Sequence, residues 1–164
     1  LISSIFSDFG STLVEPRSGM LLQNRGMGFN LIADHPNCVA PKKRPLHTII
    51  PGLTMKDGNA TMSFGVVGGH YQPVGHAQLL HAIFVEGLDV QAALNLPRSL
   101  CIDGILQLES SQPVERLAAL YALGHAVAAP PHPLGGGHGI YIDDKQGILI
   151  GGTDTRRDGI VAGY

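Results

Sequence analysis

The order of the apolar segments constrains the fold of this chain most: extended segments come first, helical segments follow, and extended segments return at the end. Between Pro73 and Val85, the apolar residues Ala77, Leu80 and Phe84 recur at helical spacing. The apolar runs before and after this region are too short for helices and are bounded by turn residues. This order predicts an α+β fold in which a mainly antiparallel sheet packs against helices.

Individual elements can be predicted from their turn and capping residues. The run from Lys56 to Asn59 is typical of a hairpin turn, and Gly87 is suited to end the first helix. We expect strands at residues 1–6, 11–14, 20–23, 47–51, 53–55, 60–67, 105–108, 139–142 and 147–150, and helices at residues 73–85, 90–95 and 113–123.

Two segments are predicted to lack regular structure. Residues 24–46 contain several glycines and prolines, and loops of this length are usually functional or disordered. The glycine-rich run from Gly135 to Gly139 lacks the Lys and Ser/Thr of a phosphate-binding loop and leads into a strand. We expect this second run to be a mobile loop.

The size of the chain, 164 residues, suits one core, so we expect a single domain over residues 1–164. Apolar residues make up 44% and charged residues only 15%. That deficit of charge indicates either a compact glycine-rich domain or a surface covered by a partner chain, and composition leaves both open.

Several classes of function are excluded by charge and motif. With a net charge of −2 and no basic stripe, the chain is not predicted to bind nucleic acid, and no apolar run is long enough to insert in a membrane. The two cysteines have no metal-ligand spacing, and His76 and His81 are five apart, on different helix faces. No metal or other cofactor is predicted.

The first residues do not follow the order of a secretory signal, and no compartment is predicted. The sequence begins without Met and enters strand-like sequence at Leu1. We therefore expect the chain to be cut from a longer precursor.

A candidate for chemistry is the pair Gly68 and Gly69, which lies between a predicted strand and a predicted helix. Without side chains, two backbone N–H groups there can converge on the negative oxygen of a tetrahedral intermediate. An ordinary glycine turn is the alternative, and spacing alone favours it.

Other candidates lie around the long loop. His47 and Thr48 can line a pocket or merely cap and pack, and Arg25 is equally a carboxylate clamp or a solvated charge. The hydroxyls of Ser3, Ser4 and Thr48 have no nearby His with an acidic partner, so no nucleophile constellation can be assembled.

Five runs carry a resemblance to a known family: FGSTLVEPRSGMLLQNRG, HPNCVAPKKRPLHTIIPGL, FGVVGGHYQPVGHAQLL, LNLPR and GGTDTRRDGIVAGY. Together they resemble the small, C-terminal subunit of the γ-glutamyltranspeptidase family. The resemblance implies the four-layer αββα sandwich of the N-terminal-nucleophile hydrolases, made from a precursor that cuts itself into large and small subunits. The implied partner is that large subunit, and a dimer of such heterodimers is allowed.

The resemblance also implies roles for residues near the reacting atoms. The family's nucleophile is the first threonine of the small subunit, whose own α-amino group is the general base. Because Leu1 corresponds to a point inside the family's second strand, that threonine is expected upstream. Ser4 matches a threonine that supports the nucleophile, Phe6 matches an asparagine that often contacts the substrate's amino acid head, and Gly68 and Gly69 match the oxyanion glycines.

Residues matching the family's donor site are altered here. His47 and Thr48 match two serines that bind the donor's α-carboxylate, and only Thr48 keeps a hydroxyl. Arg25 and Gly28 match a Glu or Gln and an Asp that hold the donor's α-ammonium. A guanidinium and a bare glycine remove that ammonium site and add repulsion.

The resemblance therefore implies an enzyme that hydrolyses small-molecule amides or transfers their acyl groups, with a donor other than a standard γ-glutamyl compound such as glutathione. We expect an acyl end without a free ammonium, such as a dicarboxylate acyl group. The alternatives are a glutaryl- or cephalosporin-type acylase and a non-catalytic subunit of the family.

Overall fold

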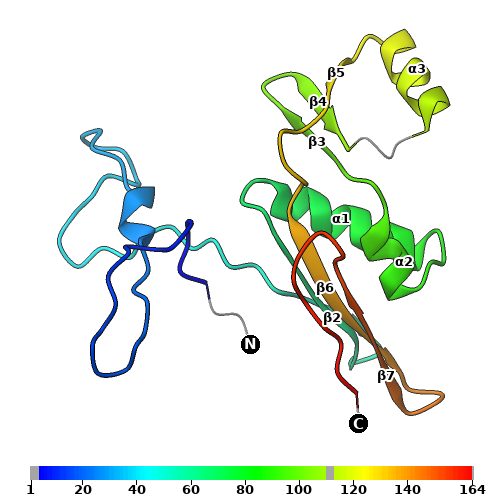
Figure 1. Cartoon of the computed structure of the whole chain (residues 1–164), viewed down its shortest axis with the longest axis horizontal. Helices are drawn as coiled ribbons and strands as arrows, with labels where there is room; N and C mark the ends of the chain where they lie inside the picture. The colour runs from blue at the N-terminus through cyan, green and yellow to red at the C-terminus, as the bar shows by residue number, and fades with distance from the viewer. Residues whose placement is uncertain (1–3, 110–112, 164) are drawn as a thin grey trace. The chain divides into compact units, whose positions relative to one another are not determined.

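The structure is a computed structural model that describes residues 4–109 and 113–163 (Figure 1). The chain divides into two compact units, the first Leu1–Ile49 and the second Ile50–Tyr164. We describe each unit by itself. That both belong to a single domain stays a prediction.

The second unit is built on an antiparallel sheet of four strands in the order β1-β2-β6-β7. Its first two strands form a hairpin whose turn residues, Asp57 and Gly58, have φ of 51° and 84°. Such left-handed turn residues match the natural twist of paired strands, so the predicted hairpin is confirmed. The strands are β1 Gly52–Lys56, β2 Asn59–Val67, β6 Gly136–Asp143 and β7 Ile148–Thr153.

Two helices, α1 Tyr71–Phe84 and α2 Val90–Asn95, pack against one face of this sheet (Figure 1). The side chain of Asp89 caps α2 by accepting the Ala92 N–H at 2.8 Å. Apolar side chains from β2 and both helices form one buried core, which includes Met62, Phe64, Val66, Leu79, Ile83, Val90 and Leu94. The predicted α+β fold with mainly antiparallel pairing is thus confirmed.

Glycines in β6 and β7 let α2 approach the sheet closely. A Cβ on Gly137 would lie 2.7 Å from Leu94, and one on Gly152 would lie 2.8 Å from Val90. The prediction of a mobile loop at residues 135–139 is therefore wrong, because β6 begins inside this run and pairs with β2 and β7. The glycines are there because no side chain fits between strand and helix.

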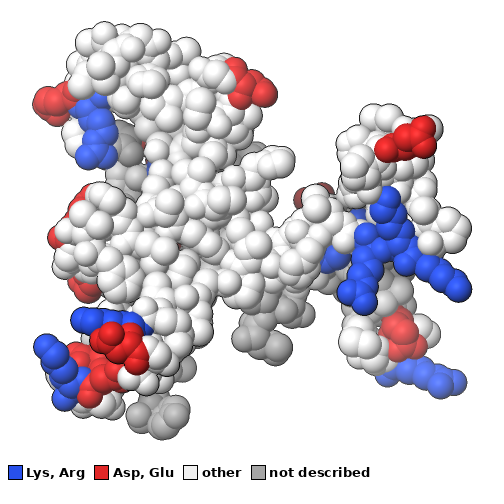
Figure 2. All heavy atoms as spheres, turned by 180° about the vertical axis from the view of Figure 1, so that it is seen from behind, with Lys and Arg blue, Asp and Glu red and all other residues white. Residues whose placement is uncertain are grey.

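The opposite face of the sheet exposes apolar side chains. Leu53 is 57% exposed, Ile140 47% and Leu149 67%, and the strand register places these residues opposite to the core face. Figure 2 shows a broad area of the second unit without charged side chains.

A second, smaller sheet follows α2. Its strands are β3 Ser99–Ile102, β4 Ile105–Leu108 and β5 Ala126–Ala128, and α3 Val114–Ala122 precedes β5. The β3–β4 pair is antiparallel, whereas β4–β5 is parallel. The sequence predicted α2 and β4 with these bounds but missed β3 and β5, whose short runs carry little periodic signal.

The first unit contains no regular strand within residues 4–49. The same described residues contain one short helix, η1 Arg25–Gly28, of 3-10 type. Residues 11–14 and 20–23 approach each other as predicted, and the Ser11 N–H donates to the Leu22 carbonyl oxygen at 2.8 Å. Between these two segments, however, only one isolated bridge forms, from Val14 to Leu21. The strands predicted at 11–14, 20–23 and 47–51 are therefore wrong. The strand predicted at 1–6 is wrong for residues 4–6, and residues 1–3 lie outside the described residues. Two isolated strands are marginal without a sheet to join.

None of the helices in the described ranges has the length and apolarity needed to cross a membrane.

Candidate active site

The Gly68–Gly69 turn joins β2 to α1 in a conformation that requires glycine. Gly68 has φ of 130° and Gly69 has φ of 58°. Their carbonyls accept the N–H groups of Tyr71 and Gln72, both at 3.1 Å, which starts the helix. Within residues 4–109 and 113–163, neither glycine N–H has a hydrogen-bond acceptor. Free N–H groups at the start of a helix attract negative charge.

Space around the two glycines differs. A Cβ on Gly68 would lie 2.8 Å from the Gly135 Cα, whereas a Cβ on Gly69 would meet nothing within 4 Å. Gly68 is therefore required both by its φ and by close backbone packing, and Gly69 only by its φ.

His76 connects α1 to the strand that leads into this turn. Its Nε2 accepts the Val66 N–H at 3.1 Å, and its ring meets Phe64 edge-on at 4.9 Å. Burial lowers the pKa of His76 from its ordinary value of 6.5. The imidazole is therefore held neutral, as an acceptor for a backbone N–H two residues before Gly68.

This environment predicts a pH-dependent stability. The unfolded chain binds a proton at His76 near pH 6.5, while the folded chain does so only at lower pH, so stability is full above about 6.5 and falls as the pH drops below it. The change His76→Gln keeps an acceptor that does not titrate. Thermal unfolding of the complete protein at pH 5 and 7.5 should show a smaller acid-induced drop in Tm for this variant. The exposed control His132→Gln should retain the wild-type drop, and an unchanged drop in His76→Gln would contradict the assignment.

In the first unit, Arg25 gathers three of the residues predicted from the sequence. Its guanidinium donates to Thr48 Oγ1 through Nη1 and to the Ser4 carbonyl oxygen at 3.5 Å through Nη2. The Phe6 ring lies 5.5 Å from the guanidinium carbon, a cation–π distance. The half-buried Arg25 is thus oriented by a hydroxyl, a carbonyl and an aromatic face.

The backbone of this cluster is strained at Phe6, whose φ is 83°. A positive φ is uncommon for a bulky residue and is often found at functional sites. The Ser4 hydroxyl accepts the Phe6 N–H at 3.2 Å. His47 is exposed and, within the described part of the chain, makes no hydrogen bond to the cluster. A Cβ on Gly28 would meet nothing within 4 Å.

The structure thus brings Ser4, Phe6, Arg25 and Thr48 together in the first unit and places Gly68 and Gly69 in the second. Among the residues described, no group of three or more His, Cys, Asp or Glu side chains is arranged to hold a metal ion.

The second unit contains a buried cluster of charged side chains that was not predicted from the sequence. Its members are Arg98, Glu109, Asp154 and Arg156. Asp154, fully buried, accepts hydrogen bonds from Arg98 Nη2, from Arg156 Nη1 at 3.1 Å and from the Gly137 N–H at 2.9 Å. Burial alone would raise the pKa of Asp154, but the Arg156 N–H and the two guanidinium groups outweigh it and lower the pKa.

Glu109 completes this cluster. It accepts the Arg98 N–H at 2.9 Å, Arg156 Nη2 at 3.0 Å and the Leu134 N–H at 3.0 Å. Arg98 comes from the run LNLPR, Asp154 and Arg156 come from GGTDTRRDG, and Glu109 directly follows β4, so the residues are far apart in the sequence and their spacing carries no recognisable pattern. Only folding reveals that they meet.

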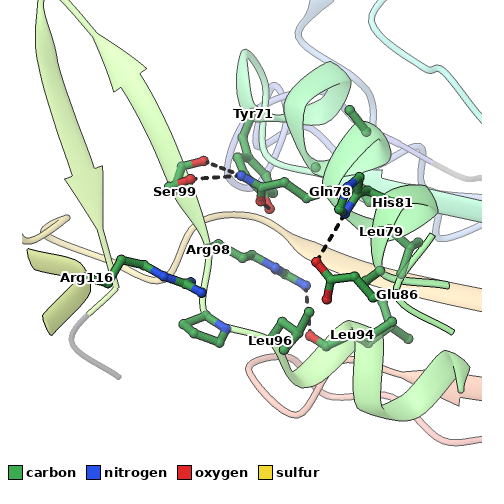
Figure 3. A pocket seen from close by; sticks show the side chains of 16 residues that line it. Tyr71, Gln78, Leu79, His81, Glu86, Leu94, Leu96, Arg98, Ser99 and Arg116 are labelled. Atoms are coloured by element: carbon green, nitrogen blue, oxygen red, sulfur yellow. Dashed lines mark hydrogen bonds and ion pairs between the residues drawn. The ribbon is translucent and has the colours of Figure 1, made fainter. Parts of the chain in front are cut away.

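A pocket of about 390 Å³ opens between α1 and the segment that links α2 to β3 (Figure 3). Gln78 spans one side by donating to the Ser99 carbonyl and hydroxyl oxygens, both at 3.0 Å, and Tyr71 donates to Gln78 at 2.9 Å. Burial raises the pKa of Tyr71 to about 12, so its hydroxyl stays protonated. None of the residues predicted as site residues lines this pocket, and we do not assign it to the substrate.

Comparison with known proteins places the chain in a family. The family model described as Gamma-glutamyltranspeptidase matches residues 1–164. The oxamate amidohydrolase proenzyme of Klebsiella pneumoniae is 34% identical over 171 residues, covering 99% of this chain and 32% of that protein. The glutathione hydrolase-like YwrD proenzyme of Bacillus subtilis is 32% identical, with the same coverage. The chain thus spans about a third of the length of these relatives.

Solved structures agree. A cephalosporin acylase from Bacillus halodurans is 40% identical, with a TM-score of 0.89 over 98% of this chain and 31% of that chain. A γ-glutamyltranspeptidase from Pseudomonas nitroreducens shares the fold, with a TM-score of 0.84 at 20% identity over 100% of this chain and 92% of that chain. The resemblance drawn from the sequence is confirmed: this chain belongs to the γ-glutamyltranspeptidase family.

Proposed function

We propose that the protein containing this chain hydrolyses small amides, or transfers their acyl groups, and that its acyl donor carries a carboxylate rather than an ammonium at the end bound by Arg25. The single observation that carries this proposal is the Arg25 cluster. Its guanidinium is oriented by Ser4, Phe6 and Thr48.

The neighbours of Arg25 leave its charge available. Within the described ranges, no Asp or Glu forms an ion pair with Arg25, and its partners are a hydroxyl, a carbonyl and a ring. A guanidinium has five N–H donors, and it binds a carboxylate through two parallel hydrogen bonds. A donor ammonium at the same place would be repelled. The cluster therefore favours an anionic acyl end.

The name of one relative supports this donor class, whereas other relatives are named for glutathione. Oxamate, named for the Klebsiella relative, is an amide whose acyl end is a carboxylate and has no ammonium. The 40% identical structure is a cephalosporin acylase, which keeps a glutaryl- or cephalosporin-type acylase as a second candidate. Relatives named glutathione hydrolase, such as that of Escherichia coli at 30% identity, take a donor with an ammonium.

The proposed reaction follows the family's chemistry. A threonine preceding Leu1 in the precursor adds its hydroxyl oxygen to the amide carbonyl, and its α-amino group takes the proton. The C–N bond then breaks and the amine leaves with that proton. Water or another amine attacks the ester and gives a proton to the α-amino group, and the threonine oxygen leaves the acyl carbon as it regains that proton. The N–H groups of Gly68 and Gly69 are the proposed donors to the oxyanion, and each such donor contributes about 10²–10³-fold to the rate.

The proposed partner is a large subunit from the same precursor. The relatives are named proenzymes and are about three times as long as this chain. The apolar sheet face that bears Leu53, Ile140 and Leu149 needs a covering layer, and we propose that the large subunit supplies it as part of a four-layer αββα sandwich.

The donor class is tested on the complete protein with matched glutaryl and γ-glutamyl p-nitroanilides, which differ only by the α-ammonium. We expect kcat/KM for the glutaryl compound to be higher by about tenfold or more, since both compounds keep the carboxylate that Arg25 would bind and only the γ-glutamyl compound adds an ammonium that the guanidinium repels. Intact mass of the same preparation should show a fragment that begins with threonine. A preference for the γ-glutamyl compound would contradict the donor assignment, and an uncut chain without activity would favour a non-catalytic subunit.

A further inference from the structure

Gly68, the first of the two proposed oxyanion glycines, packs against one short segment at the start of β6. The Gly68 Cβ position lies 2.8 Å from the Gly135 Cα, and a Cβ on Gly135 would collide with the Val67 carbonyl oxygen and lie 2.6 Å from Tyr71. The two backbones therefore meet with no side chain between them. In packing this close, a shift of residues 134–137 is transmitted to Gly68.

Buried side chains hold both ends of that segment. At one end, the Leu134 N–H donates to Glu109 at 3.0 Å and the Leu134 carbonyl accepts from Arg98 Nη1 at 2.7 Å. At the other end, the Gly137 N–H donates to Asp154 at 2.9 Å. The exposed fraction of each charged residue is below 10%.

The middle of the segment is held by Arg157. Its Nε donates to the Gly135 carbonyl at 3.1 Å, and its Cγ would be 2.5 Å from a Cβ on Gly136. Unlike the other three charged residues, Arg157 is exposed, so changing it should leave the core intact.

Arg98 also contacts the Gly68–Gly69 turn indirectly, through Tyr71. The Arg98 guanidinium lies 5.7 Å from the Tyr71 ring, and the Tyr71 Cβ lies 3.3 Å from the Gly68 Cβ position. Arg98 therefore contacts both structures that pack on Gly68, the 134–137 segment and Tyr71.

Stability alone is a weak reason for so many buried charges. Desolvation offsets much of the attraction within a buried ion pair, and apolar replacements are often as stable. Here the charged side chains also bind backbone groups of residues 134–137: Arg98 and Glu109 bind Leu134, Arg157 binds Gly135, and Asp154 binds Gly137. We infer that Arg98, Glu109, Asp154 and Arg157 are positioning residues that fix the backbone of Gly68 and Gly69 through residues 134–137.

The consequence for the rate rests on the proposed function, so the test combines two measurements on the complete, processed protein. In Arg157→Ala, amide hydrogen exchange of a peptide covering residues 66–72 should become several-fold faster, because the turn loses its support. For the glutaryl anilide, kcat should fall about tenfold, with KM changed less than twofold, as expected when an oxyanion donor is misplaced.

Two further variants separate positioning from a general loss of stability. Arg157→Lys keeps a cationic donor and should restore part of kcat. Lys145→Ala removes an exposed cation from the β6–β7 turn and should change neither measurement. Unchanged exchange or unchanged kcat in Arg157→Ala would overturn the inference. If the wild-type protein hydrolyses no amide, the proposed function fails, and the exchange measurement alone then decides the positioning.

Discussion

Alanine in place of Gly68 is expected to lower kcat of the complete enzyme for the glutaryl anilide by about 10²–10³-fold, the usual effect of losing one oxyanion donor. Two physical effects combine at this position. The φ of 130° is closed to residues with a side chain, and the new methyl group would lie 2.8 Å from the Gly135 Cα. Both force the turn to rearrange, which displaces its N–H groups from the reacting oxygen.

Neighbouring glycines supply the controls. A Cβ at Gly69 meets nothing within 4 Å, so the only cost of Gly69→Ala is the backbone strain of an alanine at a φ of 58°. This variant should therefore lose less activity than Gly68→Ala. Gly147, in the β6–β7 turn, has φ of 67° and equally open surroundings, so Gly147→Ala matches that backbone cost away from the site. Gly68→Ala with near wild-type kcat and an intact Tm would remove Gly68 from the proposed machinery.

Charge reversal at Arg25 is expected to change the donor that the enzyme prefers. In Arg25→Glu, kcat/KM for the glutaryl anilide should fall about 100-fold, because charge-assisted hydrogen bonds of about 1.5–3 kcal/mol are replaced by repulsion. The γ-glutamyl anilide should gain severalfold, since a carboxylate at this place attracts its ammonium. The ratio of the two kcat/KM values is the measurement, because it cancels a general loss of active protein.

Arg17 offers a matched control in the same unit. It is exposed and lies outside the Arg25 cluster, so Arg17→Glu makes the same change of charge without touching the Ser4, Phe6 and Thr48 contacts. Its donor ratio should equal that of the wild type. An equal shift in both variants would mean that long-range charge, and not the Arg25 cluster, selects the donor.

Much of the second unit could be predicted from sequence because local signals are strong there. Helix α2, strand β4 and the Asp57–Gly58 hairpin turn follow from capping residues, apolar runs and turn chemistry that act over a few residues. In the first unit, the short apolar runs suggested strands, but pairing needs a neighbouring sheet that the chain does not give them there. The glycine run at 135–139 was misread for a related reason, because its partner is a helix more than forty residues earlier.

By itself, the sequence determined the family and the α+β class, because these depend on short motifs and on apolar periodicity; the oxyanion role of Gly68 and Gly69 stays a prediction. Only the tertiary structure showed that Arg25 meets Thr48, Ser4 and Phe6. It alone also showed that Asp154 and Glu109 hold residues 134–137, the segment that packs on Gly68. The physical reason is that a charged side chain in a sequence is expected to lie in solvent unless its binding partners are known. Those partners lie at separations along the chain that no local pattern encodes.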